Sequence, residues 1–399
     1  MSPRFSFNRM EFAGSLGDLG TLLPIAIAMV LVVGLNPVGL FFSIALFYLI
    51  SGAYFGVTVP VQPMKVIGAY AVATAMNPSE ILASSLLMAC ALLFIGLTGS
   101  IDFIRKYTEK SVIRGVQLTT GTLLVAGGIK FIIGKSHLQT LLGKVEPYLK
   151  IQSIGPVPIS IILGCLAIII TFAFLKSKKY PAALVVIISG ALVGIVLSKD
   201  LALQLNDIGL HFPQFLPYPI PTLPDLSFAL IALVLPQLPM TMGNAVIAYS
   251  DLSQEYFGDD AHRITNKALC ISMAGANFVS FFLGGMPLCH GAGGLAAHYR
   301  FGARTAGSNI IIGAIFLGLA LFFGEKCIVI LNFLPLSVLG ALLVFAGAQL
   351  TMTIIDLEKK EDYFVATMIL GISLATNLAI GFVIGIILTK LFKTNKFSL

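Results

Sequence analysis

The sequence predicts an all-α integral membrane protein with about fourteen transmembrane segments. Of its 399 residues, 57% are hydrophobic and only 11% are charged, and the mean hydropathy is +0.96. Long apolar stretches follow one another along the chain, each bounded by glycine, proline or charged residues. This composition is typical of a membrane protein, because each helix that crosses the hydrocarbon core needs about 20 apolar residues.

The expected segments follow from these boundaries, taken in order. Their approximate cores are 13–33, 38–56, 60–76, 80–100, 112–133, 154–175, 181–198, 227–250, 264–284, 287–299, 306–324, 335–354, 361–376 and 377–393. The stretches 320–355 and 361–393 can be divided into segments in other ways, which would change the number of segments. Segments three and ten are too short to cross a core of roughly 30 Å as full helices, so we interpret them as half-helices.

The basic residues predict the orientation of the chain. An even number of segments puts both ends on one side, and most lysines and arginines fall on that side, among them Arg9, Arg114, Arg263, Arg300 and Lys393. Cytoplasmic loops carry an excess of Lys and Arg. We therefore expect a multi-pass protein of the cytoplasmic (inner) membrane with both termini in the cytoplasm.

Two halves of about seven segments indicate an inverted repeat. Residues 1–199 form the expected first half and residues 227–399 the second, with a proline-rich extracytoplasmic connector at 200–226. We expect no soluble C-terminal domain. An odd number of segments per half inverts the second copy in the membrane, an arrangement with which many secondary transporters form a central site.

Segments three and ten carry the features expected of that site. Segment three opens with Pro60 and Pro63 just before Lys65, and segment ten opens with Pro287 just before a glycine cluster. Each segment is third in its half. Interrupted segments at corresponding positions are the best sequence indication of a transport site, and backbone broken at membrane depth must face protein, water or a ligand.

The chemistry of these two segments predicts an anion site. Each helix N-terminus offers unpaired N–H groups and about half a positive charge. Burial of the Lys65 ammonium costs about 2.5–3.5 kcal/mol unless a negative partner is present. A small dianion matches these charges, and glycines let the backbone approach it closely. The candidate substrate contacts are Gln62, Lys65, Cys289, His290, Gly291, Ala292, Gly293 and Gly294.

Segments one and eight supply candidates for coupling or support of the site. Segment one carries Asp18 among glycines and before Pro24, which predicts a broken or closely crossed helix. Asp18 either carries a proton for coupling or positions its neighbours, and the sequence does not separate these roles. Segment eight contains two prolines that free backbone groups, with side chains able to bond nearby at Gln237, Thr241 and Asn244.

Structural interpretations stand beside these functional ones. Lys65 can pair with Asp18, His290 can be a polar residue satisfied between helices, and the glycines can allow helices to cross. His298 and Arg300 fall at the cytoplasmic end of segment ten, where we expect interfacial positions rather than a gating role.

The sequence argues against a metal site, a nucleic-acid partner and a membrane-embedded enzyme, the last of which is a third alternative. The five cysteines are odd in number and form no C-x-x-C pair, and Cys289, His290 and His298 lack a third close ligand, so neither disulfides nor a metal site is expected. The net charge of +7 lies in short connectors without interleaved aromatic residues, which argues against a nucleic-acid partner. An enzyme needs a convergent acid–base or metal cluster, and none is evident.

Three runs of residues resemble the signatures of the molybdate transporter family, a branch related to the sulfate permeases. They are Gly14–Thr21, Pro60–Lys65 and Met286–Ala296, the last followed by Tyr299–Arg304. The resemblance implies a seven-plus-seven inverted repeat, with segments one to four and eight to eleven in a core domain and the rest in a gate domain. It also implies oxyanion substrates. His298 departs from the glutamine of the family pattern.

We therefore expect a secondary active transporter that imports molybdate, with a sulfate permease of the same fold as the alternative. An anion channel, without a saturable site or coupling, is the alternative from another class. The expected partners are molybdate or sulfate, a coupling proton, membrane lipids and a second copy of the chain in a homodimer. No cofactor is expected.

Overall fold

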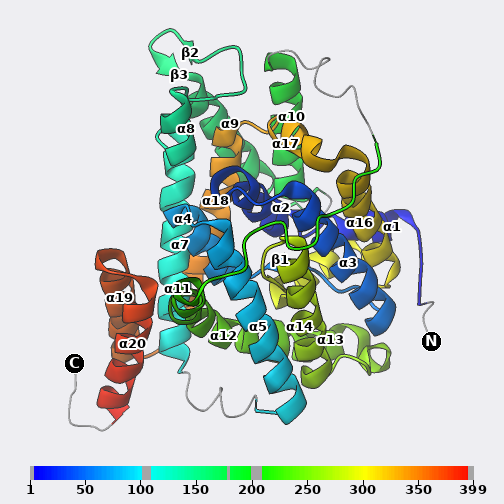
Figure 1. The fold of residues 1–399 in the computed structure, drawn as a ribbon, viewed down its shortest axis with the longest axis vertical. Coiled ribbons are helices and arrows are strands. Elements are labelled where there is room, and N and C mark those ends of the chain that lie inside the picture. The colour runs from blue at the N-terminus through cyan, green and yellow to red at the C-terminus, as the bar shows by residue number, and fades with distance from the viewer. Residues whose placement is uncertain (1–3, 101–108, 178–179, 199–208, 394–399) are drawn as a thin grey trace.

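A computed structural model describes residues 4–100, 109–177, 180–198 and 209–393 (Figure 1). Each of the fourteen expected segments contains helix, and most helix bounds lie within a few residues of the expected ones. Within the described ranges, seven helices are long and apolar enough to cross a membrane, or eight if the bent first pair is one span. Residues 200–208 of the expected connector lie outside the described residues.

The first half begins with a broken helix. It contains α1 (Arg9–Ser15), α2 (Leu19–Ala28) with a π-helical end η1 (Met29–Val33), α3 (Pro37–Phe55), α4 (Lys65–Thr74), α5 (Pro78–Thr98), α7 (Lys110–Ile132), α8 (His137–Leu142), α9 (Ile159–Phe174) and α10 (Ala182–Leu197). The bend between α1 and α2 is 42°, which confirms the break expected around Asp18.

The second half begins with one long helical run. This run comprises α11 (Leu223–Phe228), η2 (Ala229–Val234), α12 (Leu235–Met240), η3 (Thr241–Ile247) and α13 (Ala248–Phe257). Pro236 and Pro239 lie in α12, and a π-helical stretch flanks α12 on each side. A proline lacks the N–H donor and crowds the preceding turn, and a wider π turn accommodates that disruption.

The remaining helices complete the second half. They are α14 (Asn266–Leu283), α15 (Ala292–Phe301), α16 (Gly307–Gly318) with η5 (Leu319–Phe323), α17 (Cys327–Leu331), α18 (Leu336–Thr351) with η7 (Met352–Asp356), α19 (Lys360–Ala375) and α20 (Leu378–Lys393). A hairpin of β2 (Ser153–Ile154) and β3 (Val157–Pro158) lies beside the start of α9.

Two short strands join the halves at the centre of the molecule (Figure 1). Strand β1 (Gln62–Pro63) pairs antiparallel with β4 (Leu288–Cys289), with Gln62 opposite Cys289 and Pro63 opposite Leu288. The Asn277 side chain bonds both the N–H and the carbonyl of Leu288, and Asn309 does the same for Val59. Extended backbone inside a membrane protein is stable here because these partners replace the missing helical hydrogen bonds.

The helices pack in two groups. The first group contains α1 to α5 and α11 to α16, in which α5 contacts α14 and α3 contacts α16. The second group contains α7, α9, α10 and α18 to α20, and Figure 1 shows α19 and α20 beside one end of the long helix α7. Helices α7 and α18 approach closely because Gly121 faces Gly347 and Gly128 faces Gly340 across their contact.

Candidate functional site

The starts of α4 and α15 meet where β1 and β4 pair, and a cavity of about 270 Å³ opens beside them. The first group of helices lines one side of this main cavity with Asp18, Thr21, Gln62, Lys65, Gly293 and Arg300. The second group lines the other side with residues of α9, α10 and α18, including Thr171, Phe345 and Gln349. The cavity therefore lies between the two groups.

Asp18 and Gln62 form a buried pair at the base of the main cavity. The Gln62 Nε2 amide donates to both carboxylate oxygens of Asp18, at 2.9 and 2.7 Å. Asp18 is 5% exposed and Gln62 is 1% exposed, while the Gln62 Oε1 atom has no hydrogen-bond partner among the described residues. The break between α1 and α2 thus places a carboxylate where it holds a residue of β1.

The glycines at the start of α15 differ sharply in their surroundings. A Cβ built on Gly294 would lie 2.5 Å from Asp18 Oδ2 and 2.7 Å from Gln62 Nε2, and one built on Gly291 would clash with Gln62 Oε1. A Cβ on Gly293 would meet nothing within 4 Å, because Gly293 faces the main cavity. Gly291 and Gly294 are therefore needed for packing, whereas Gly293 keeps space open.

The first turn of α15 leaves backbone donors unpaired. In the part of the chain that the structure describes, the N–H groups of Ala292, Gly293 and Gly294 have no hydrogen-bond partner, and the first bond of the turn runs from Leu295 N–H to the Gly291 carbonyl. Unpaired N–H groups at a helix N-terminus attract negative charge.

The first turn of α4 is different, because a side chain caps it. The Gln237 Oε1 atom accepts from the N–H of Val66 at 2.9 Å and of Ile67 at 3.4 Å, while its Nε2 donates to Thr241 Oγ1 at 2.9 Å. The expectation that both helix ends offer unpaired donors is therefore wrong for α4: Gln237, held by Thr241, accepts from two of its N–H groups, whereas the start of α15 keeps three unpaired N–H groups among the described residues.

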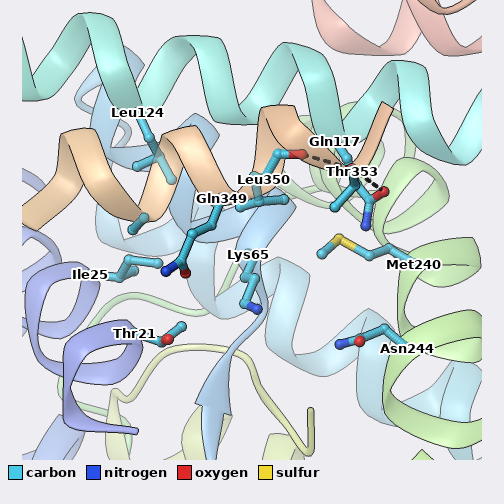
Figure 2. A pocket seen from close by; sticks show the side chains of 11 residues that line it. Thr21, Ile25, Lys65, Gln117, Leu124, Met240, Asn244, Gln349, Leu350 and Thr353 are labelled. Atoms are coloured by element: carbon cyan, nitrogen blue, oxygen red, sulfur yellow. Dashed lines mark hydrogen bonds between the residues drawn. The ribbon is translucent and has the colours of Figure 1, made fainter. Parts of the chain in front are cut away.

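Lys65 has no ion-pair partner within 4.0 Å among the described residues, so the structure does not form the considered pair with Asp18. Its ammonium projects between Thr21 and Asn244 (Figure 2). Lys65 also lines a second, smaller cavity of about 110 Å³, together with Gln117, Asn244 and Gln349. Both cavities thus share the positive charge of Lys65, and Asp18 is the one carboxylate among the described residues that line either cavity.

His290 and Cys289 lie outside the linings of both cavities. The His290 Nδ1 atom is 3.0 Å from the Pro60 carbonyl, which can only accept, so Nδ1 donates and Nε2 accepts from Ser272 Oγ at 3.1 Å. Phe47, Phe55 and Tyr249 surround the ring. His290 therefore fits the structural interpretation, and the buried Cys289 side chain faces the Pro63 carbonyl at 3.9 Å.

The expected interfacial position of His298 is wrong. The side chain is fully buried, its Nδ1 lies 2.8 Å from Thr58 Oγ1 and its Nε2 has no partner among the described residues. Thr58 comes from the stretch before β1, which covers this face of α15. Arg300 is exposed at the rim of the main cavity, as expected of an interfacial residue, and it donates to the Lys176 and Ser177 carbonyls at 3.4 and 3.2 Å and so connects the two helix groups.

The sequence interpretation missed the contribution of the second group. The expected segment 112–133 contains a single side-chain amide, Gln117 of α7. The expected segment 335–354 likewise contains only Gln349 of α18. Polar residues inside a membrane helix mark functional sites by default, and this signal would have identified both.

Comparison with known proteins decides the family. A model described as "Molybdate transporter of MFS superfamily" matches residues 10–124 and 229–350, more than half of the chain. The chain is 31% identical to Molybdate transporter 2 of Arabidopsis thaliana, over 96% of this chain and 87% of the relative. The chain belongs to the molybdate transporter family.

Other molybdate transporters resemble it over similar lengths. Molybdate transporter 1 of Arabidopsis thaliana is 29% identical over 94% of this chain and 86% of the relative, and Molybdate transporter 1 of Chlamydomonas reinhardtii is 27% identical over 94% and 90%. Both stretches matched by the family model contain residues of the site, Asp18 and Lys65 in the first and Gln237 and Gly293 in the second.

Solved structures of anion transporters share the fold of this chain. The transmembrane domain of a cyanobacterial bicarbonate transporter, BicA, aligns with a TM-score of 0.65 and 15% identity over 95% of this chain and 96% of that chain. A murine Solute Carrier 26 family member A9 anion transporter aligns with a TM-score of 0.66 and 16% identity over 100% of this chain and 70% of that chain. At this identity the likeness concerns the fold alone.

Proposed function

We propose that this molybdate transporter family member is a secondary active transporter that imports molybdate across the cytoplasmic membrane. The observation that carries the proposal is the unpaired Lys65 ammonium beside three unpaired N–H groups of α15, at a cavity between two groups of helices. The names of the relatives support molybdate as the ion.

The dianion would bind in the main cavity. Ala292, Gly293 and Gly294 donate backbone N–H groups, and Lys65 supplies a full positive charge. The helix end adds roughly half a charge, so these groups together outweigh the single negative charge of Asp18 in the same lining and leave the site net positive for a tetrahedral dianion. Gly293 leaves room for the ion, while Gln62, held by Asp18, forms part of the wall.

Movement of one helix group against the other would expose the ion to each side in turn. Helices α4 and α15 have ten residues each, or about 15 Å of rise, half of a hydrocarbon core of roughly 30 Å. We interpret them as half-helices of a seven-plus-seven inverted repeat, with the first group as the core domain and the second as the gate domain. Both termini would lie in the cytoplasm, as the basic residues indicate.

Uptake of molybdate by purified protein in liposomes, followed by elemental analysis with and without excess sulfate, tests this function. We expect saturable uptake of molybdate that sulfate inhibits only weakly. Equal transport of sulfate would assign a sulfate permease, uptake that does not saturate would assign a channel, and no transport of either ion would reject the site.

Asp18→Asn tests whether Asp18 carries the coupling proton. A carboxylate that lines a cavity can take a proton from water, whereas an amide cannot. If Asp18 couples transport to protons, uptake by the variant will lose its dependence on external pH while molybdate binding persists. A pH dependence identical to that of the wild type would contradict the coupling role, and a lowered Tm would instead identify Asp18 as a structural partner of Gln62.

A further inference from the structure

The smaller cavity is lined by both groups of helices, with Lys65 in its wall (Figure 2). Its volume of about 110 Å³ far exceeds the roughly 10–15 Å³ that one water requires. It shares Thr21, Lys65, Ala346 and Gln349 with the main cavity. The two cavities therefore adjoin each other at the Lys65 side chain.

The polar groups of the smaller cavity suit an anion. Lys65 supplies the one charged group in the lining, and the other polar side chains are the amides and hydroxyls of Thr21, Gln117, Asn244, Gln349 and Thr353. In contrast with the main cavity, where Asp18 takes part, the described residues that line this space include no carboxylate. An anion here would meet amide and hydroxyl donors without facing a negative charge.

Gln117 is oriented for this purpose by its neighbours. Its Oε1 atom accepts from Arg114 Nη1 at 2.8 Å and from Thr353 Oγ1 at 3.0 Å. Asp356 holds the Arg114 guanidinium through Nε at 2.8 Å and through Nη2. Because Arg114 and Thr353 both donate to Oε1, this oxygen faces them, and the Nε2 group on the opposite arm of the amide points away from Arg114 and Thr353.

That Nε2 group points into the smaller cavity (Figure 2). Gln117 is 5% exposed, and in the described part of the chain its Nε2 donates no hydrogen bond. Donors that face a cavity without a protein partner are available to water or to a bound ion. The geometry thus presents two N–H donors to the same space as the Lys65 ammonium.

We propose that the smaller cavity is a second position for a tetrahedral oxyanion on the transport path, in which Gln117 and Lys65 bind the ion after it leaves the main cavity. This proposal rests on the proposed function. Lys65 serves both positions in turn, and Gln117 serves only the second. The gate domain thereby contributes a specific contact to the ion in transit.

Gln117→Leu and Gln117→Glu test the second position by two separate measurements. Equilibrium dialysis of purified protein with molybdate measures binding, and uptake by proteoliposomes measures transport. For Gln117→Leu we expect unchanged molybdate binding in the main cavity and a maximal uptake rate about tenfold lower, because a hydrogen bond to a charged group is lost in transit. Gln117→Glu directs a carboxylate oxygen toward the ion and should lower the rate further.

The outcomes separate this proposal from the function itself. Unchanged uptake by both variants, or binding weakened by the same factor as uptake, would overturn the second position while leaving the transporter intact. A wild-type protein that binds no molybdate would overturn both proposals. Thr122→Val, on α7 but outside both cavity linings, is the matched control. An equal loss in that control would assign the effect to helix packing and overturn the proposal.

Discussion

Lys65→Ala is expected to abolish molybdate uptake and to leave the protein folded. Lys65 is the one full positive charge shared by both cavities, and loss of a charge-assisted hydrogen bond weakens anion binding by about 10- to 100-fold. Stability should not fall, because Lys65 has no ion-pair partner within the described residues and its burial costs about 2.5–3.5 kcal/mol. Uptake in liposomes and Tm in detergent are the two measurements.

Lys65→Arg and Lys65→Met test whether uptake depends on the positive charge at position 65 or only on the length of the side chain. Arginine keeps the charge on a larger group, so it should retain part of the uptake, whereas methionine keeps only the length of the side chain and should behave like alanine. Normal uptake by Lys65→Met would show that binding and transport of molybdate do not require the Lys65 ammonium. A strong fall in Tm for both Ala and Met would instead indicate a structural role.

Gly293 and Gly294 should respond in opposite ways to the same substitution. Gly294→Ala forces a Cβ to within 3 Å of Asp18, Gln62 and Pro60, so we expect destabilisation of about 1–3 kcal/mol and loss of uptake. Gly293→Ala places its Cβ in open space and raises helix propensity, so stability should rise by about 0.5–1 kcal/mol. Thermal unfolding of the two purified variants gives the comparison.

A larger residue at position 293 separates packing from binding. Gly293→Leu should fold like the alanine variant, because its side chain enters the main cavity, and should block uptake by filling the space that the ion needs. Wild-type apparent affinity for molybdate in Gly293→Leu would show that the ion binds elsewhere. Equal destabilisation by alanine at 293 and at 294 would contradict the described packing.

The helices could be predicted from the sequence because their boundaries are local. Helix α3 begins at Pro37 directly after Asn36, whose side chain accepts from Val38 N–H at 2.8 Å, and α5 begins at Pro78 inside a capping box of Asn77 and Glu80. A proline in the first turn and an asparagine at the N-cap are local signals that can be recognised from the sequence alone. The break at Asp18 was predictable for the same reason.

The partners of the site could not be predicted, because they come from distant parts of the chain. Gln237 caps α4 from 171 residues away, and the sequence shows only a glutamine between two prolines. His298 is buried against Thr58 and Tyr48, which its own helix does not reveal. Periodicity reports which face of a helix is apolar, but it does not report which helix covers that face.

The pairing of β1 with β4 has a consequence for the energetics of the cycle. Because Gln62 and Pro63 are bonded to Cys289 and Leu288, the donors that hold the ion are expected to travel as one rigid body. The backbone donors of α15 and the Lys65 ammonium would then stay with the ion whichever side the site faces, while the contacts from the second group change. Half-saturation should accordingly be similar from both sides, and the electrochemical gradients of the ion and of any coupled proton, rather than a change in affinity, would set the direction of net flow.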